Sequence, residues 1–89
     1  MDTWLHRTRL FKTRGLAARQ IAQGRVRLTR GPTTTRVTKP HFQLRPGDHL
    51  TLLRERELFQ LEVLALPHRR GPAPEAQSCY ARTEDADAG

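Results

Sequence analysis

The feature that most constrains the fold is a change of periodicity at Gly24. Before this glycine, apolar residues recur at helical spacing through residues 2–23. After it, residues 25–29 alternate strictly, with Val26 and Leu28 on one side of an extended chain. Glycine ends helices readily because it adopts the left-handed backbone conformation without strain. The sequence therefore predicts a helix, a glycine stop and a half-buried strand in direct succession.

Two short helices are expected before Gly24, joined at residues 12–14. Their buried stripes are Trp4, Leu5, Thr8 and Phe11 in the first helix, and Leu16, Ala17 and Ile21 in the second. Helices this short are not stable in isolation, so both stripes must pack on a third layer. Trp4 is accordingly expected in the core and not on a surface that stacks on bases.

The third layer is a small sheet. Beyond residues 25–29, extended segments are predicted at residues 36–40, 49–53 and 58–66, separated by a loop at residues 30–35 and turns at residues 44–48 and 54–57. Together these elements predict an α+β fold, with two N-terminal helices packed on a three- to four-stranded, mainly antiparallel sheet.

The composition changes at Pro67, where apolar residues give way to Pro, Ala, Gly and acids. We expect one domain in residues 1–66 and a Pro/Ala-rich, acidic-ending tail in residues 67–89. The tail is expected to be mobile or only locally ordered, with room for a helical turn or two in residues 75–82.

The basic residues are distributed unevenly. The formal net charge is +7, and residues 1–47 hold eleven Lys or Arg against one acid, whereas residues 48–89 hold five against eight. Arg outnumbers Lys fourteen to two, and its planar fork binds phosphate bidentately. Codon bias explains an Arg-rich composition but not the asymmetry between the halves. The pattern indicates a basic binding half whose natural partners are polyanions.

Other function classes find no support in the sequence. Cys79 is the single cysteine, so neither an intrachain disulfide nor a cysteine-based metal cluster is possible. The four histidines lack metal-ligand spacing, and the carboxylates form no acid–base pair in an apolar pocket. No apolar run approaches the roughly 20 residues of a membrane helix, and no signal peptide is evident. We expect no enzyme activity, no cofactor, no metal, no membrane contact and a cytoplasmic location.

Several motifs resemble a known family. They are Trp4-Leu5, Phe11-Lys12-Thr13-Arg14, Leu16-Ala17, Ile21, Gly24-x-Val26, Val37-x-Lys39-Pro40 and Leu44-x-Pro46-Gly47-Asp48. In this order they resemble the RNA-binding domain named after small-subunit ribosomal protein S-four, which has the αL motif. A narrower resemblance to the heat-shock protein 15 family rests on Asp2-x-Trp4-Leu5, Lys12-Thr13-Arg14 and Arg69-Arg70-Gly71-Pro72-Ala73-Pro74-Glu75-Ala76.

The resemblance implies a stand-alone module, a monomer in solution, that binds structured RNA. Its implied target is ribosomal RNA of the large subunit, during recovery of stalled ribosomes or from heat shock. The chain departs from the family in four places. It lacks the usual Arg-Leu before Asp2, and Gln20 stands where an apolar residue is usual. A longer loop at residues 29–35 is expected in place of the short Asn-Gly hairpin, and the C-terminal end is acidic rather than basic.

The resemblance also implies where RNA binds: at the start of the second helix, at its glycine turn and on the adjoining strand. The candidate RNA-binding residues there are Arg9, Lys12, Thr13, Arg14, Arg19, Arg25, Arg27, Arg36 and Lys39. A helix N-terminus favours phosphate oxygens through its free N–H groups and dipole. Such contacts recognise the shape and backbone of folded RNA, and they predict binding that weakens steeply with salt.

Each of these residues also has a purely structural interpretation. Exposed helix faces are normally charged, Arg9 could pair with Asp2 or Glu62, and Thr13 could be only a helix cap. Two other functions stay open as well. The basic face could dock an acidic protein, as in an interaction adaptor, or it could bind DNA, because phosphate contacts do not distinguish the two nucleic acids.

Overall fold

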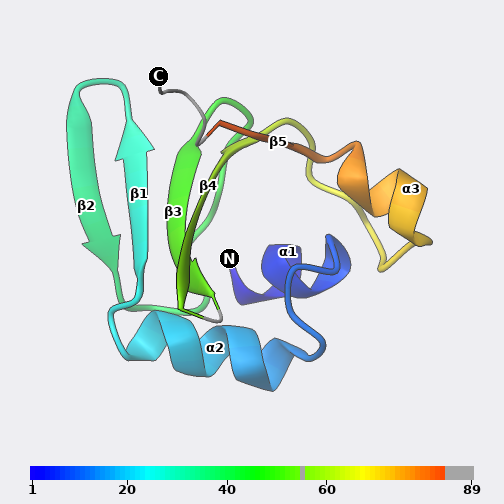
Figure 1. The fold of residues 1–89 in the computed structure, drawn as a ribbon, viewed down its shortest axis with the longest axis horizontal. Helices are drawn as coiled ribbons and strands as arrows, with labels where there is room; N and C mark the ends of the chain where they lie inside the picture. The colour runs from blue at the N-terminus through cyan, green and yellow to red at the C-terminus, as the bar shows by residue number, and fades with distance from the viewer. Residues whose placement is uncertain (55, 84–89) are drawn as a thin grey trace.

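The computed structural model describes residues 1–54 and 56–83 of the chain. In chain order its elements are α1 (Asp2–Arg7), α2 (Arg14–Ala22), β1 (Val26–Arg30), β2 (Thr33–Val37), β3 (His49–Arg54), β4 (Glu57–Val63), α3 (Ala73–Gln77) and β5 (Tyr80–Arg82). The described strands form one antiparallel sheet in the order β2-β1-β3-β4-β5, and Figure 1 shows α1 and α2 together on one side of it. The predicted α+β class is confirmed, with five strands in place of three or four.

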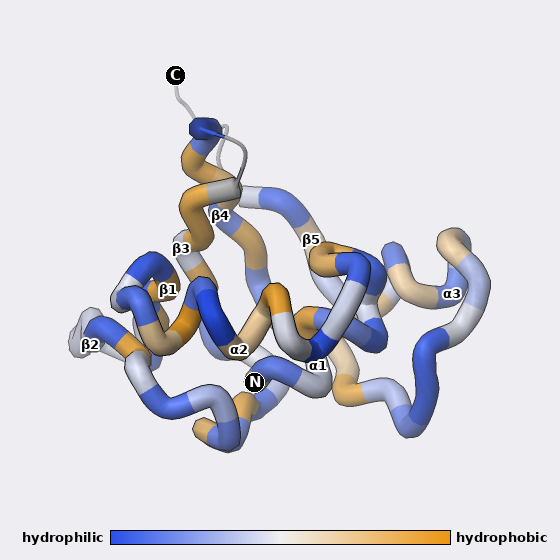
Figure 2. Tube along the Cα trace, turned by 90° about the horizontal axis from the view of Figure 1, so that it is seen from below, coloured by the Kyte–Doolittle hydropathy of each residue, from blue (hydrophilic) through white to orange (hydrophobic). Residues whose placement is uncertain are grey.

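One face of the sheet packs on the helices and the other is open. Val26 lies opposite both Val37 and Leu52 in the ladder, and all three side chains are buried. They meet Ala17 and Ile21 of α2, each fully buried, in the same core. In Figure 2 short hydrophobic and hydrophilic segments alternate along the chain, as expected for a sheet with one buried face.

The first helix is shorter than its apolar stripe predicted. α1 ends at Arg7, where the Thr8 hydroxyl donates to the Trp4 carbonyl at 2.8 Å, and Arg9 follows with φ of 65°. The left-handed conformation at Arg9 turns the chain away from the helix axis. Phe11 therefore reaches the core from a loop. The second stripe is also narrower than predicted, since Leu16 is 40% exposed.

The loop expected at residues 30–35 is a tight hairpin. Arg30 pairs with Thr33 in the β1–β2 ladder, so only Gly31 and Pro32 connect the strands. Gly31 has φ of 62°, the value required at the first position of a type II′ turn. The expected replacement of the family's short hairpin by a longer loop is therefore wrong, as is the placement of the second extended segment at residues 36–40.

After β4 the structure describes residues 64–83, where α3 overlaps the helical turn expected in residues 75–82 and β5 is a strand that the sequence did not predict. Residues 64–72 cross to the helix side, α3 follows, and β5 returns to pair with β4. Ala76 and Cys79 are buried beneath this excursion. Tyr80 packs edge-on against Trp4 and Phe59, with ring centroids 6.3 and 6.2 Å away. The acidic end of the chain, residues 84–89, lies outside the described residues.

Three arginines fasten this excursion to α1 and the turn that follows it, and we refer to them as the arginine clasp. Arg7 Nη1 donates to Pro67 O at 2.9 Å, Arg9 Nε to Gly71 O at 2.6 Å and Arg70 Nε to His6 O at 3.0 Å. Trp4 Nε1 adds a further hydrogen bond to Ala65 O at 2.8 Å. Bonds from charged donors to carbonyls are stronger than neutral ones, so the clasp stabilises the C-terminal part of the fold.

An ion pair between a half-buried arginine and a buried aspartate lies at the other end of the sheet. Asp48 is 2% exposed and accepts from Arg30 Nε and Nη2, both at 2.8 Å. It also accepts from the Arg45 backbone N–H at 2.8 Å, which closes the turn before β3. The hydrogen bonds from Arg30 hold the pKa of Asp48 below its ordinary value. Arg30 therefore has a structural partner, and Asp48 ties β1 to this turn.

Candidate nucleic-acid interface

The second helix begins at a side-chain cap. Thr13 is the N-cap of α2, and its hydroxyl oxygen accepts from the Leu16 backbone N–H at 3.0 Å. The structural interpretation of Thr13 is therefore correct, although its hydroxyl hydrogen remains able to donate to a ligand. Lys12 and Arg14 on either side are both exposed.

Lys12 and Arg14 line two different depressions beside α2. Lys12 lines a groove beside β3 together with Arg25, whereas Arg14 lines a separate depression with Asp2. Arg14 Nη2 lies 3.5 Å from Asp2 Oδ2, and its side chain is 64% exposed. An exposed pair of this length contributes little stability and leaves the guanidinium accessible. The structure thus separates two residues that are close in sequence.

Arg27 and Arg36 are directly paired across two strands of the sheet. They occupy opposite positions in the β1–β2 ladder, so their side chains share the open face of the sheet. Arg36 also crosses the glycine turn that ends α2, because its Cδ lies 3.0 Å from the position that a Cβ on Gly24 would occupy. Gly24 has φ of 76°, which confirms the left-handed stop predicted from the sequence.

Arg25 connects this pair to the groove beside α2. It lines that groove and, with Arg27, a second depression on the open face of the sheet. Among the described residues, no carboxylate lies within ion-pair distance of Lys12, Arg25, Arg27 or Arg36. We call these four residues the cationic surface.

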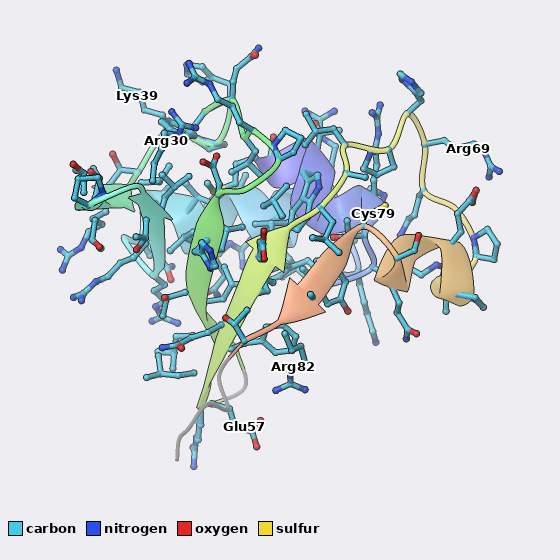
Figure 3. All side chains as sticks on the ribbon, turned by 90° about the horizontal axis from the view of Figure 1, so that it is seen from above. Arg30, Lys39, Glu57, Arg69, Cys79 and Arg82 are labelled. Carbon is cyan, nitrogen blue, oxygen red and sulfur yellow. The ribbon has the colours of Figure 1, made fainter. Side chains whose placement is uncertain are left out.

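The remaining candidates lie outside the cationic surface. Arg19 is exposed on the side of α2 opposite the buried Ala17 and Ile21, and so it points away from the sheet. Lys39 lies two residues beyond β2 and extends from the side of the molecule where Arg30 is found (Figure 3). Arg9 belongs to the arginine clasp and pairs with neither Asp2 nor Glu62.

The structure adds residues that sequence reasoning missed. Arg56, at the β3–β4 turn with φ of 71°, lines the same groove as Lys12 and Arg25. Leu53 and Leu58 are opposite each other on the open face and are 40% and 62% exposed. Arg56 was not selected from the sequence, because charged residues in a turn normally contact only solvent. The described residues contain no group of three or more potential metal ligands and no helix suited to span a membrane.

Comparisons with known proteins agree with these observations. No family model matches the chain. The chain is 33% identical over 86 residues to a heat shock protein 15 homolog from Haemophilus influenzae. The match covers 97% of this chain and 62% of that relative. The chain thus spans less than two thirds of that relative's length.

A solved structure has a similar fold over most of the chain. A solved structure of heat shock protein 15 from Vibrio cholerae, described as trimeric, matches with a TM-score of 0.82 and 29% identity, over 93% of this chain and 79% of that one. Sequence and fold similarity both support the heat shock protein 15-like family and the S-four-type αL fold that the motifs predict.

Proposed function

We propose that this chain is a non-catalytic module that binds structured RNA through the cationic surface. The observation that carries the proposal is the placement of Arg27 directly opposite Arg36 with no acid paired to either among the described residues. Like charges opposite each other in a ladder destabilise a sheet. A polyanion on the open face removes that cost, because each guanidinium then gains a phosphate partner.

The remaining candidates are proposed as further contacts outside this surface. Arg14 and Thr13 can reach a phosphate at the start of α2, and Arg19 and Lys39 add charge at its margins. Arg9 supports the surface indirectly, since its guanidinium holds the C-terminal part of the fold in place. Contacts of this kind follow the backbone and shape of a folded RNA.

We further propose that the target is ribosomal RNA of the large subunit, bound in the cytoplasm when translation stalls or recovers from heat shock. The support for this assignment is similarity to proteins named heat shock protein 15. The chain is proposed to act as a monomer. The related Vibrio cholerae structure is described as trimeric, so light scattering of this chain, with and without RNA, is the measurement that decides.

A salt series tests the central proposal. In a filter-binding or shift assay, structured ribosomal RNA should bind tightly at low salt and weaken steeply as salt rises. Competition should favour structured RNA over duplex DNA of equal length. Absent or salt-insensitive binding would refute RNA recognition, and preference for the duplex would make the chain a DNA-binding module.

A pull-down after nuclease treatment distinguishes the adaptor function. An RNA-binding module should release its ribosomal partners when RNA is digested. An adaptor that docks an acidic protein on the cationic surface should retain that protein.

A further inference from the structure

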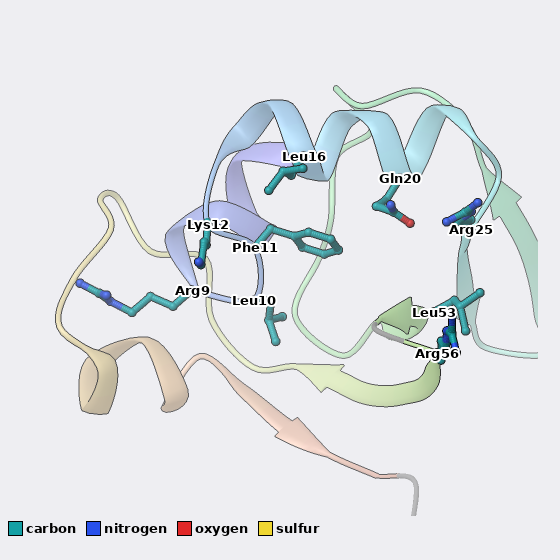
Figure 4. Close-up of a pocket in the computed structure, with 9 residues that line it drawn as sticks. All are labelled: Arg9, Leu10, Phe11, Lys12, Leu16, Gln20, Arg25, Leu53 and Arg56. Carbon is teal, nitrogen blue, oxygen red and sulfur yellow. The ribbon is translucent and has the colours of Figure 1, made fainter.

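A groove runs between α2 and the β3–β4 turn, and Figure 4 shows the residues that line it. Its volume is about 610 Å³, and its lining comes from the loop after α1, from α2 and from the end of the sheet near Arg25. The Phe11 ring lies in the middle, with Leu16 on one side and Leu10 on the other (Figure 4). Leu16 and Leu53 are each 40% exposed, so apolar surface faces water here.

A buried acceptor faces the same groove. Gln20 points from α2 toward the space between Phe11 and Arg25 (Figure 4). Its Oε1 is inaccessible to solvent, and no hydrogen-bond donor among the described residues reaches it. An unpaired buried oxygen costs free energy that a donor on a bound ligand would recover. The groove therefore combines apolar walls with one unsatisfied acceptor.

The charged residues described at the rim of the groove are basic. Lys12, Arg25 and Arg56 are exposed around it, and no acidic side chain among residues 1–54 and 56–83 contributes to its lining. Arg9 also borders the groove, but its guanidinium extends away toward Gly71 (Figure 4). An apolar peptide side chain would fill the groove but would leave the basic side chains at its rim without anionic partners. A nucleotide matches both, because its base is flat and apolar on its faces and its phosphate is anionic.

We propose that this groove receives a single unpaired nucleobase of the bound RNA. The base packs on Phe11 between Leu16 and Leu53, and the Gln20 side chain rotates toward the groove so that its Oε1 accepts an amino or imino hydrogen from the base. Lys12, Arg25 and Arg56 hold the phosphates on either side of the extruded nucleotide. The inference rests on the proposed RNA function and adds a preference for RNA with a bulged or looped-out base next to a duplex.

The test compares two RNA hairpins that differ only at one position. One has a single bulged adenosine, and the other has an abasic nucleotide in the same place. The full chain should bind the adenosine hairpin at least about fivefold more tightly, because stacking of one base on protein contributes on that scale. This ratio cancels the charge contribution that the two RNAs share.

Two variants locate the effect in the groove. Gln20→Leu keeps the side-chain volume and removes the acceptor, so the ratio should fall by the contribution of the hydrogen bond while the thermal midpoint stays equal or rises. Leu53→Gln should lower the ratio as well. Leu66→Gln is the matched control, because Leu66 is 46% exposed and lines a different depression. It should leave the ratio unchanged.

The outcomes separate the two proposals. Equal, salt-dependent affinity of the wild-type chain for both hairpins would overturn the nucleobase groove and leave RNA binding intact. Failure to bind either hairpin at low salt would overturn the proposed function and the groove with it. A ratio that survives both groove variants would place the base elsewhere on the protein and refute this inference.

Discussion

Replacing both Arg27 and Arg36 with glutamine should weaken RNA binding without weakening the fold. The two side chains share the open face at opposite ladder positions and have no acidic partner among the described residues. If each contacts one phosphate, their loss should reduce the slope of log affinity against log salt by about 1.4–1.8, at roughly 0.7–0.9 per phosphate. The wild-type advantage should then shrink about seven- to twelvefold for a fourfold rise in salt.

The stability of the same variant should move in the opposite direction. Removing two like charges from opposing positions should leave the free energy of unfolding unchanged or raise it by about 0.5 kcal/mol. A purely structural role for the two arginines predicts a loss of stability instead. Filter binding at several salt concentrations and urea denaturation measure the two quantities on the same preparation.

The control removes the same charge from another part of the molecule. Arg45 is exposed in the turn before β3, and the Arg69 side chain is 70% exposed in a surface pair with Glu75. Replacing both with glutamine should leave the salt slope near the wild-type value. A slope unchanged in the Arg27 and Arg36 variant, or reduced equally in the control, would refute the placement of the interface.

Three further predictions concern the fold around this surface. Asp48→Asn should lower the free energy of unfolding by about 1–3 kcal/mol at neutral pH. Arg30 lowers the pKa of Asp48, so the stability difference between the wild-type chain and this variant should be complete above the ordinary carboxyl pKa and disappear as pH falls through the lowered value. Equal stability of the two proteins at pH 7 would contradict this reasoning. Arg9→Ala should speed amide exchange in β5 and cost about 1 kcal/mol through the bond to Gly71, and unchanged exchange would show that the clasp is dispensable. Gly24→Ala should lower the free energy of unfolding by about 1–2 kcal/mol from backbone strain alone, because Gly24 has φ of 76°. It should also weaken RNA binding, because the added Cβ displaces Arg36. A variant as stable as the wild-type chain would contradict the left-handed conformation at Gly24.

The sequence was sufficient for the elements that local patterns determine. The alternation of Val26 and Leu28 after Gly24 places β1 correctly, because side-chain period and glycine conformation are properties of the segment itself. The burial of Trp4 follows from its position in the apolar stripe of α1. The same reasoning overextended that helix to Phe11, since apolar spacing alone does not reveal the left-handed turn at Arg9.

The C-terminal addition could not be predicted in the same way. β5 has three residues, and its partner β4 lies far away in the sequence, so no local pattern specifies the pairing. The arginine clasp binds backbone carbonyls, which every residue type possesses. The amino-acid sequence therefore does not identify which residues accept these hydrogen bonds. For the same reason the hydrogen bond from Arg9 Nε to Gly71 was not foreseen, and Arg9 stays an exposed candidate RNA contact.

The candidate site shows the same limit. The cations were evident in the sequence, but which of them share a face depended on the register between β1 and β2. The two-residue turn at Gly31 and Pro32 sets that register, and the expected longer loop left it undefined. Arg56 joined the site only because the β3–β4 turn folds beside α2.

The added strand also determines which borders of the sheet could join another chain. Without β5, the seven-residue border of β4 would present unpaired backbone groups beside apolar side chains, a template for aggregation. β5 covers the last three residues of this border, where it pairs with residues 61–63 of β4, and the guanidinium of Arg82 lies 4.1 Å from the centre of the Phe59 ring. The opposite border, β2, exposes threonines and Arg36 after Pro32. Capping of part of one border and the hydrophilic side chains of the other both disfavour edge-to-edge addition of further strands.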